Sequence, residues 1–239
     1  MNRITSAEYP ATGTVHVSDW ENARRLTAGT SLVASPLLLT AAFLVVPTTA
    51  NNPATVLNVI AAHSTRWYLF GLFLLLSYLL LVPATLGLIH LTHHRSPAWG
   101  NVGGSLAILG AITAVSDTRL WVFAQQQMAD PDADRAQMLA LLARLEGAAG
   151  ASLPFILGAL ALLTGTVMLA VGLYRARAVA AWVCAALAAG IVASFAAWFA
   201  GSQPALVATS LLLAVGYGGV GVGFVRQSVA AWQRGDGVH

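Results

Sequence analysis

The chain has 239 residues, of which 57% are hydrophobic and only 9% are charged. Soluble domains carry about 25% charged residues, so this composition excludes an ordinary water-soluble domain. The formal net charge of +3 comes from scattered arginines, without the basic stripe that a nucleic-acid-binding protein needs. At about 20 apolar residues per span, six spans account for most of the chain. We therefore predict an all-α fold, a polytopic membrane helix bundle with six transmembrane helices.

The residue types that hold many cofactors are scarce. Lysine is absent, since all 12 basic residues are arginine, and this excludes a retinal or pyridoxal Schiff base and a P-loop lysine. Cys184 is the single cysteine and falls in an apolar span, which argues against a disulfide framework or a thiolate metal site. We expect no cofactor and no metal ion. The bilayer is the expected partner, and the oligomeric state stays open.

The first 25 residues are polar and do not resemble a cleaved signal peptide, whose apolar core would begin nearer Met1. Ser18 and Glu21 fit a capping box, which predicts a helix start that leads into span one, about residues 26–46. Pro36 is expected to kink this span. We divide the chain into a cytoplasmic N-terminal tail and helix start (1–25), a six-helix transmembrane domain (26–226) and a cytoplasmic C-terminal tail (227–239).

Residues 47–66 are expected to form the first external loop, with a short amphipathic helix at 53–62 whose apolar side lies against the bilayer. Span two, about residues 67–91, places Trp67 at the outer interface. Its other end carries His90, His93 and His94. A metal ion there would need further ligands, such as Asp19 or Glu21, and interfacial histidines beside Arg95 are the favoured interpretation.

Span three, about residues 99–126, opens with Gly100 and Gly104, a spacing typical of close helix packing. A short amphipathic outer helix is predicted between spans three and four, with Asp130 as its N-cap and Gly147 at its end. Spans four, five and six follow at about residues 151–174, 179–200 and 204–225. Small residues at helical spacing, in the fourth span Gly158, Ala161, Gly165 and Gly172, predict close backbone approach.

The arginines predict the orientation of the bundle. With a cytoplasmic N-terminus, eight arginines fall in inner segments, namely Arg3, Arg24, Arg25, Arg95, Arg175, Arg177, Arg226 and Arg234. The outer segments then hold three, Arg66, Arg135 and Arg144. This bias satisfies the positive-inside rule. We therefore expect a multi-pass protein of the cell membrane with both termini in the cytoplasm.

Several segments carry a resemblance to a known group. They are residues 53–57, 61–67 and 81–87, the helix from Arg135 to Glu146 and the turn from Gly172 to Arg177. Together they resemble a widespread group of six-span bacterial integral membrane proteins of unknown function, over about residues 26–226. The resemblance implies the six-helix fold, and it brings no activity and no catalytic residues.

Asp117 is the single acidic residue that falls inside a predicted span. A charge near the bilayer centre costs about 3 kcal/mol on insertion scales, so an acid in a span is a functional candidate. From an inner edge near Val102, Asp117 lies roughly 22 Å along the helix, in the outer third of a core about 30 Å thick. Thr113, Trp121 and Gln125 lie at four-residue steps from it and predict a polar and aromatic stripe toward the bundle interior.

Other polar residues are predicted near the outer mouth. Arg119 lies about 200° around the helix from Asp117, so the two do not form a simple pair within the helix. His63, Arg66 and Glu146 are candidates to surround Asp117. The alternatives are that Asp117 only locks helix packing, through a neighbouring span or an arginine such as Arg66, and that Glu146 is a solvated residue at a helix end.

Three hypotheses about function follow. The first is a membrane protein that binds or passes a lipophilic small molecule in an outward-side pocket around Asp117. Its polar anchors would be Asp117 and Arg119, and Thr113, Trp121, Gln125 and Arg66 would complete the binding residues. The second is an intramembrane acid–base enzyme, a cyclase or isomerase of lipid-like substrates, with Asp117 as proton donor and Glu146 or His63 as its partner. The third is a structural or immunity-type membrane partner without a pocket.

Overall fold

The computed structural model describes residues 17–47, 53–93, 95–228 and 232, and this part of the chain is helical with short turns and no strand. Six helical segments are long and apolar enough to cross a membrane, and they cover residues 19–45, 64–92, 97–128, 153–176, 181–199 and 203–226. The predicted all-α bundle of six membrane-spanning helices is therefore confirmed. The protein is an integral membrane protein in its architecture.

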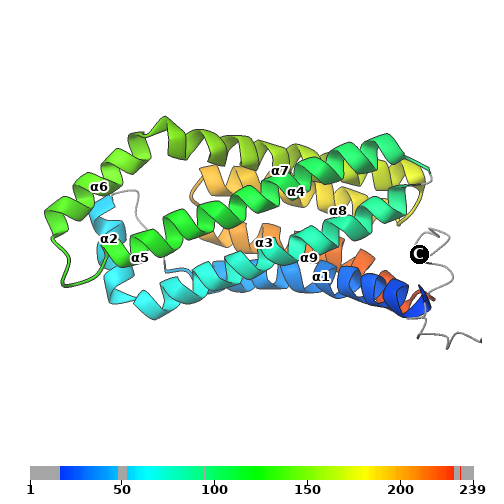
Figure 1. Cartoon of the computed structure of the whole chain (residues 1–239), viewed down its shortest axis with the longest axis horizontal. Helices are drawn as coiled ribbons and strands as arrows, with labels where there is room; N and C mark the ends of the chain where they lie inside the picture. The colour runs from blue at the N-terminus through cyan, green and yellow to red at the C-terminus, as the bar shows by residue number, and fades with distance from the viewer. Residues whose placement is uncertain (1–16, 48–52, 94, 229–231, 233–239) are drawn as a thin grey trace, which may run out of the picture.

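The spanning helices run roughly along one long axis (Figure 1). The helix bounds are α1 (Val17–Val45), α2 (Pro53–Ala62), α3 (Ser64–Thr92), α4 (Pro97–Asp117), the π-helix η1 (Thr118–Phe123), α5 (Ala124–Met128), α6 (Arg135–Gly147), α7 (Ala149–Ala176), α8 (Ala181–Phe199) and α9 (Gln203–Arg226). We call the end where α1 begins and α9 ends the terminal end, and the opposite end, with α2, α5 and α6, the distal end. The turn between α8 and α9 stops short of the distal end (Figure 1).

Helix contacts arrange the bundle around two apolar clusters. Helix α1 packs on both α3 and α9, α4 packs on α7 and α3, and α8 packs on α9 and α7. One cluster fills this main bundle. The other, which we call the distal cluster, lies toward the distal end and is formed mainly by α1, α2, α3, η1 and α6. Tyr78 of α3 packs against both clusters, so it lies where they meet.

The closest helix approach is a seam between α4 and α7 that depends on glycine. A Cβ atom on Gly110 would lie 2.5 Å from the backbone nitrogen of Leu162 and 2.7 Å from the carbonyl oxygen of Gly158. A Cβ atom on Gly103 would lie 3.0 Å from the carbonyl oxygen of Gly165. Glycine is needed at these positions because any side chain would collide with backbone atoms that cannot move aside. The predicted packing role of Gly158 and Gly165 is confirmed.

The short helix α2 forms over the predicted residues, but its predicted surroundings are wrong. Leu57 and Ile60 are each 0% exposed and belong to the distal cluster, rather than lying against the bilayer. Arg135 of α6 donates to the carbonyl oxygen of Ala54 over 3.2 Å and also contacts the side-chain oxygen of Asn58. The helix is therefore held between protein elements on its apolar side and by a link to α6 on its polar side.

The helix α6 begins at a different cap from the predicted one. The Asp130 carboxylate accepts from the backbone nitrogen of Asp132 over 2.9 Å, which makes a local turn instead of a helix start. Asp134 is the N-cap, and its carboxylate accepts from the amides of Ala136 and Gln137 over 2.9 and 3.2 Å. The helix ends at Gly147 as predicted, and its buried Leu142 joins the distal cluster.

Candidate functional site

The helix that carries Asp117 changes its winding directly after it. Asp117 is the last residue of α4, and Thr118–Phe123 form a π-helix, where sequence reasoning predicts a continuous α-helix. A π-helical turn is wider than an α-helical one, and such turns are found frequently at functional sites. The wider turn rotates Trp121 and Gln125 relative to Asp117 from the positions that a regular four-residue spacing gives.

The π-helix is held by a buried tryptophan from α3. The indole nitrogen of Trp67 donates to the carbonyl oxygen of Val122 over 2.8 Å. Trp67 is only 5% exposed and packs in the distal cluster, so its ring is buried by protein, and its predicted level at the outer membrane interface stays a prediction. This hydrogen bond joins α3 to the last turn of the irregular segment.

Asp117 itself is half-buried. Among the described residues, no hydrogen bond or ion pair reaches its carboxylate. Neither Arg66 nor Arg119 pairs with it. The carboxylate does interact electrostatically with the hydroxyl group of Tyr78, on the neighbouring helix α3. Tyr78 was not predicted as a site residue, although a tyrosine in the middle of a leucine-dense span is a signal that points to it.

The seam between α4 and α7 ends one helical turn before Asp117. Its last close contact joins Thr113 and Gly158. Beyond that point η1 contacts α3, α4 and α5, and within the described part of the chain no comparable contact joins it to α7. Figure 1 shows the rod of α4, η1 and α5 running away from α7 toward the distal end.

Apolar side chains on both sides of this divergence are exposed. On the π-helix Leu120 is 46% exposed, and on α7 Leu157 is 65% exposed. In a membrane such side chains face lipid. Asp117 therefore lies where η1 and α7 diverge, just beyond the closely packed part of the α4–α7 pair.

The other predicted residues of the stripe lie on the same rod. The Thr113 hydroxyl donates to the carbonyl oxygen of Leu109 over 2.9 Å, which ties it to its own helix. Trp121 is half-buried and packs against the distal cluster, and Gln125 is half-buried as well. Arg119 is exposed, which agrees with its expected direction away from Asp117.

The three remaining candidates come from other segments. His63 precedes α3, is exposed and caps no backbone group with its side chain. The Arg66 side-chain nitrogen Nε donates to the carbonyl oxygen of Val45 over 3.1 Å, which links α3 to the end of α1. Glu146 belongs to α6, and its side chain lies outside the described residues. Their approach to Asp117 therefore stays a prediction.

The histidines at the terminal end make contacts of their own. His90 stacks on Trp232 with ring centroids 4.2 Å apart, and its Nε2 lies 2.8 Å from the Trp232 carbonyl oxygen. His94 lies outside the described residues. Among the side chains that the structure describes, no group of three histidine, cysteine or acidic residues is placed to hold a metal ion.

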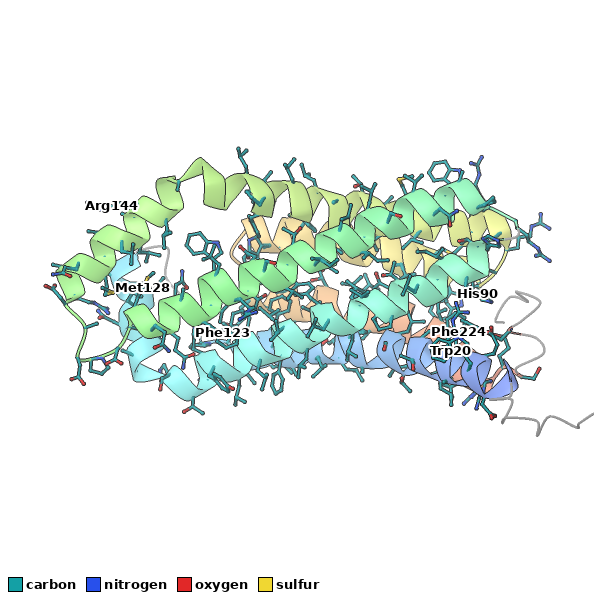
Figure 2. The ribbon with its side chains drawn as sticks, viewed as in Figure 1. Trp20, His90, Phe123, Met128, Arg144 and Phe224 are labelled. Atoms are coloured by element: carbon teal, nitrogen blue, oxygen red, sulfur yellow. The ribbon has the colours of Figure 1, made fainter. Side chains whose placement is uncertain are left out.

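Two surface hollows are found at the terminal end, and neither is lined by Asp117. One has a volume of about 440 Å³ and lies between α8 and α9. The other has a volume of about 500 Å³ and lies between α1 and α3, beside Trp232. Figure 2 shows Trp20, His90 and Phe224 together at this end, and Phe123, Met128 and Arg144 toward the other.

No family model, no curated protein and no solved structure matches the chain. The resemblance to six-span bacterial membrane proteins consequently stays a prediction. What the molecule itself establishes is a six-helix membrane bundle with a carboxylate that has no hydrogen-bond or ion-pair partner among the described residues, beside a π-helical turn.

Proposed function

We propose that this membrane protein binds or passes a lipophilic small molecule between η1 and α7, where the two helices diverge, with Asp117 as the polar anchor. The observation that carries the proposal is the carboxylate without a hydrogen-bond or ion-pair partner in the described part of a spanning helix. A charge at the bilayer centre costs about 3 kcal/mol on insertion scales and a charge in the outer third of the core costs less, so this carboxylate is retained at a moderate cost. A carboxylate kept only to lock helices would be expected to have a partner on a neighbouring span.

The surroundings of the carboxylate favour a particular class of ligand. A carboxylate accepts hydrogen bonds, so it favours a head group that donates them, such as a hydroxyl or an amine. The exposed Leu120 on η1 and Leu157 on α7, with the half-buried Trp121, offer apolar surface on the two diverging helices. We therefore propose a ligand with one donor head group and a long apolar body. Arg119 would interact with a polar group nearer the membrane surface.

A second candidate is an acid–base enzyme acting on a lipid-like substrate. The observation that favours it is that the charge of Asp117 acts on the Tyr78 hydroxyl, a second proton-carrying group on the neighbouring helix α3. A pair of this kind is suited to give a proton to one atom of a substrate and to take one from another. In this case His63 and Glu146 are the further candidates for proton transfer.

Binding is tested with the full chain in nanodiscs and two probes, dodecylamine and dodecanol. A ligand that binds only the folded protein raises its unfolding temperature. We expect dodecylamine to stabilise the wild type and Asp132→Asn, an exposed acid in the distal turn, but not Asp117→Asn. Equal shifts in all three proteins, or no shift with either probe, would contradict the proposal.

The enzyme alternative is separated from binding by its products. The wild type and Asp117→Asn are incubated with a total lipid extract, and the recovered lipids are compared by mass spectrometry. A product formed by the wild type alone would favour the enzyme. Binding without any product would favour a protein that binds or passes the molecule unchanged. The absence of both binding and product would favour a structural partner.

We also propose that both termini face the cytoplasm of the cell. The support is the distribution of arginines along the chain. In a Cys184→Ala background, an impermeant maleimide on intact cells should label Ala136→Cys, in α6 at the distal end, but not Ala98→Cys, near the start of α4. Labelling of Ala98→Cys alone would reverse the orientation.

A further inference from the structure

A second site lies at the terminal end of the bundle, in the hollow of about 500 Å³ between α1 and α3. Its lining changes in character along the helices. Trp20, Arg24 and His93 line the part nearest the helix ends, while Pro83 and Leu86 line the deeper part. At 1.5 Å per residue, Leu86 and Pro83 lie about 6 and 10 Å further along α3 than His90. A polar rim thus leads into an apolar groove over the depth of a membrane interface.

Trp232 forms part of the wall of the hollow and is held there by contacts with three helices. It is 2% exposed, and its indole ring stacks on His90 and meets Phe224 edge-on at a centroid distance of 4.8 Å. Its indole nitrogen donates to the Glu21 carboxylate over 3.3 Å. Its carbonyl oxygen can only accept, so His90 Nε2, 2.8 Å away, carries the proton of that hydrogen bond. These contacts tie Trp232 to α1, α3 and α9.

The rim of the hollow is basic on balance. The Arg24 side chain is 50% exposed and has one ion pair, 3.5 Å from its Nη1 to Glu21. Its other two nitrogens have no hydrogen-bond partner within the described part of the chain. Glu21 is already shared between Arg24 and Trp232, and His90 and His93 face the hollow from α3. An anionic group at the rim would therefore find donors that the protein leaves available on Arg24.

From this combination we infer that the hollow binds an anionic phospholipid. The phosphate group lies at Arg24 and His93, and one acyl chain follows Pro83 and Leu86. Basic pockets between membrane helices are known to bind anionic lipid head groups. Exposed Trp20 lies beside the rim, at the level where tryptophan side chains anchor to the interface. The site is at the opposite end from Asp117 and does not depend on the function proposed there.

The inference is tested by native mass spectrometry of the full chain released from nanodiscs with equal amounts of phosphatidylglycerol and phosphatidylcholine. We expect the wild type to retain phosphatidylglycerol in preference. Arg24→Gln should lower its apparent affinity about fivefold, which corresponds to the ~1 kcal/mol contributed by one basic side chain near an anionic surface. The matched control Arg226→Gln removes an exposed charge at the same end and should change it less than about twofold.

A second variant tests the acyl part of the site without changing any charge. Leu86 is 54% exposed, so Leu86→Trp fills the groove without disturbing the core and should also lower phosphatidylglycerol retention. Equal retention by the wild type and both variants, equal loss with Arg226→Gln, or no preference over phosphatidylcholine would overturn the inference. Displacement of the lipid by inorganic phosphate would overturn it as well, because the ligand would then be a soluble anion.

Discussion

The two halves of the α4–α7 pair differ sharply in packing. Toward the terminal end, Gly103 and Gly110 bring the two backbones into contact with Gly158 and Gly165. Toward the distal end, after Thr113, the rod becomes a π-helix and loses its contact with α7. We call the packed half, up to Thr113, the closed half and the diverging half the open half. The closed half has no charged residue between Gly103 and Gly110, and the Asp117 carboxylate lies where the open half begins.

This difference separates stability from function within one helix. Helix association in a membrane is driven by dispersion contacts, which the glycine seam provides over a long stretch. The distal half is held by other means, chiefly by Trp67 and the distal cluster. The open half is thus free to place a costly carboxylate without weakening the main contact. Three substitutions test this difference between the two halves.

The largest effect is expected in the closed half. Gly110→Ala places a Cβ atom 2.5 Å from the Leu162 backbone, so the helices must separate, with a loss of about 3 kcal/mol in the free energy of unfolding. The control is Gly218→Ala in α9, where no neighbour lies within 4 Å and the added methyl group should stabilise the helix by up to about 1 kcal/mol. Denaturant unfolding in detergent measures both. Similar values for the two variants would show that the seam does not hold the bundle.

An intermediate effect is expected from Trp67→Phe. The change removes the indole donor to the Val122 carbonyl together with part of a buried ring, which should cost about 2 kcal/mol. Hydrogen exchange should become faster in residues 118–126 and unchanged in the glycine seam. Trp198→Phe, at a residue that is exposed, is the control. Faster exchange over the whole of α4 in Trp67→Phe would mean that the two halves are one cooperative unit.

The smallest effect is expected from Asp117→Asn. Because the carboxylate has no hydrogen-bond or ion-pair partner in the described residues, its neutralisation should change the free energy of unfolding by less than about 1 kcal/mol, with any change stabilising. Unfolding of the wild type and of Asp132→Asn under the same conditions provides the reference. A loss of 2 kcal/mol or more would mean that Asp117 locks the helices after all.

The sequence predicts some of these features and not others, for physical reasons. The six spans and Asp117 could be predicted because membrane length and an intramembrane charge are both visible in composition. Periodicity identified the apolar sides of α2 and α6, but it does not say whether such a side meets lipid or protein. That is why Leu57 and Ile60 were expected at the bilayer and are instead buried by protein.

The π-helix was not predicted, and the reason is different. Residues 118–123 contain neither glycine nor proline, so no local signal of irregular winding exists. The irregularity is tied to Trp67 on another helix, and a contact between distant segments cannot be read from local propensity. The same applies to Tyr78, whose relation to Asp117 depends on how α3 and α4 are placed side by side.

The central claim is that Asp117 is accessible where η1 and α7 diverge while the seam nearby is closed. It is tested most directly by thiol labelling in bilayers, in a Cys184→Ala background, with a lipophilic maleimide. The account predicts that Asp117→Cys is labelled readily. Ala111→Cys, at a residue that is 0% exposed in the closed half, should stay unlabelled. Equal protection of both cysteines would contradict the account.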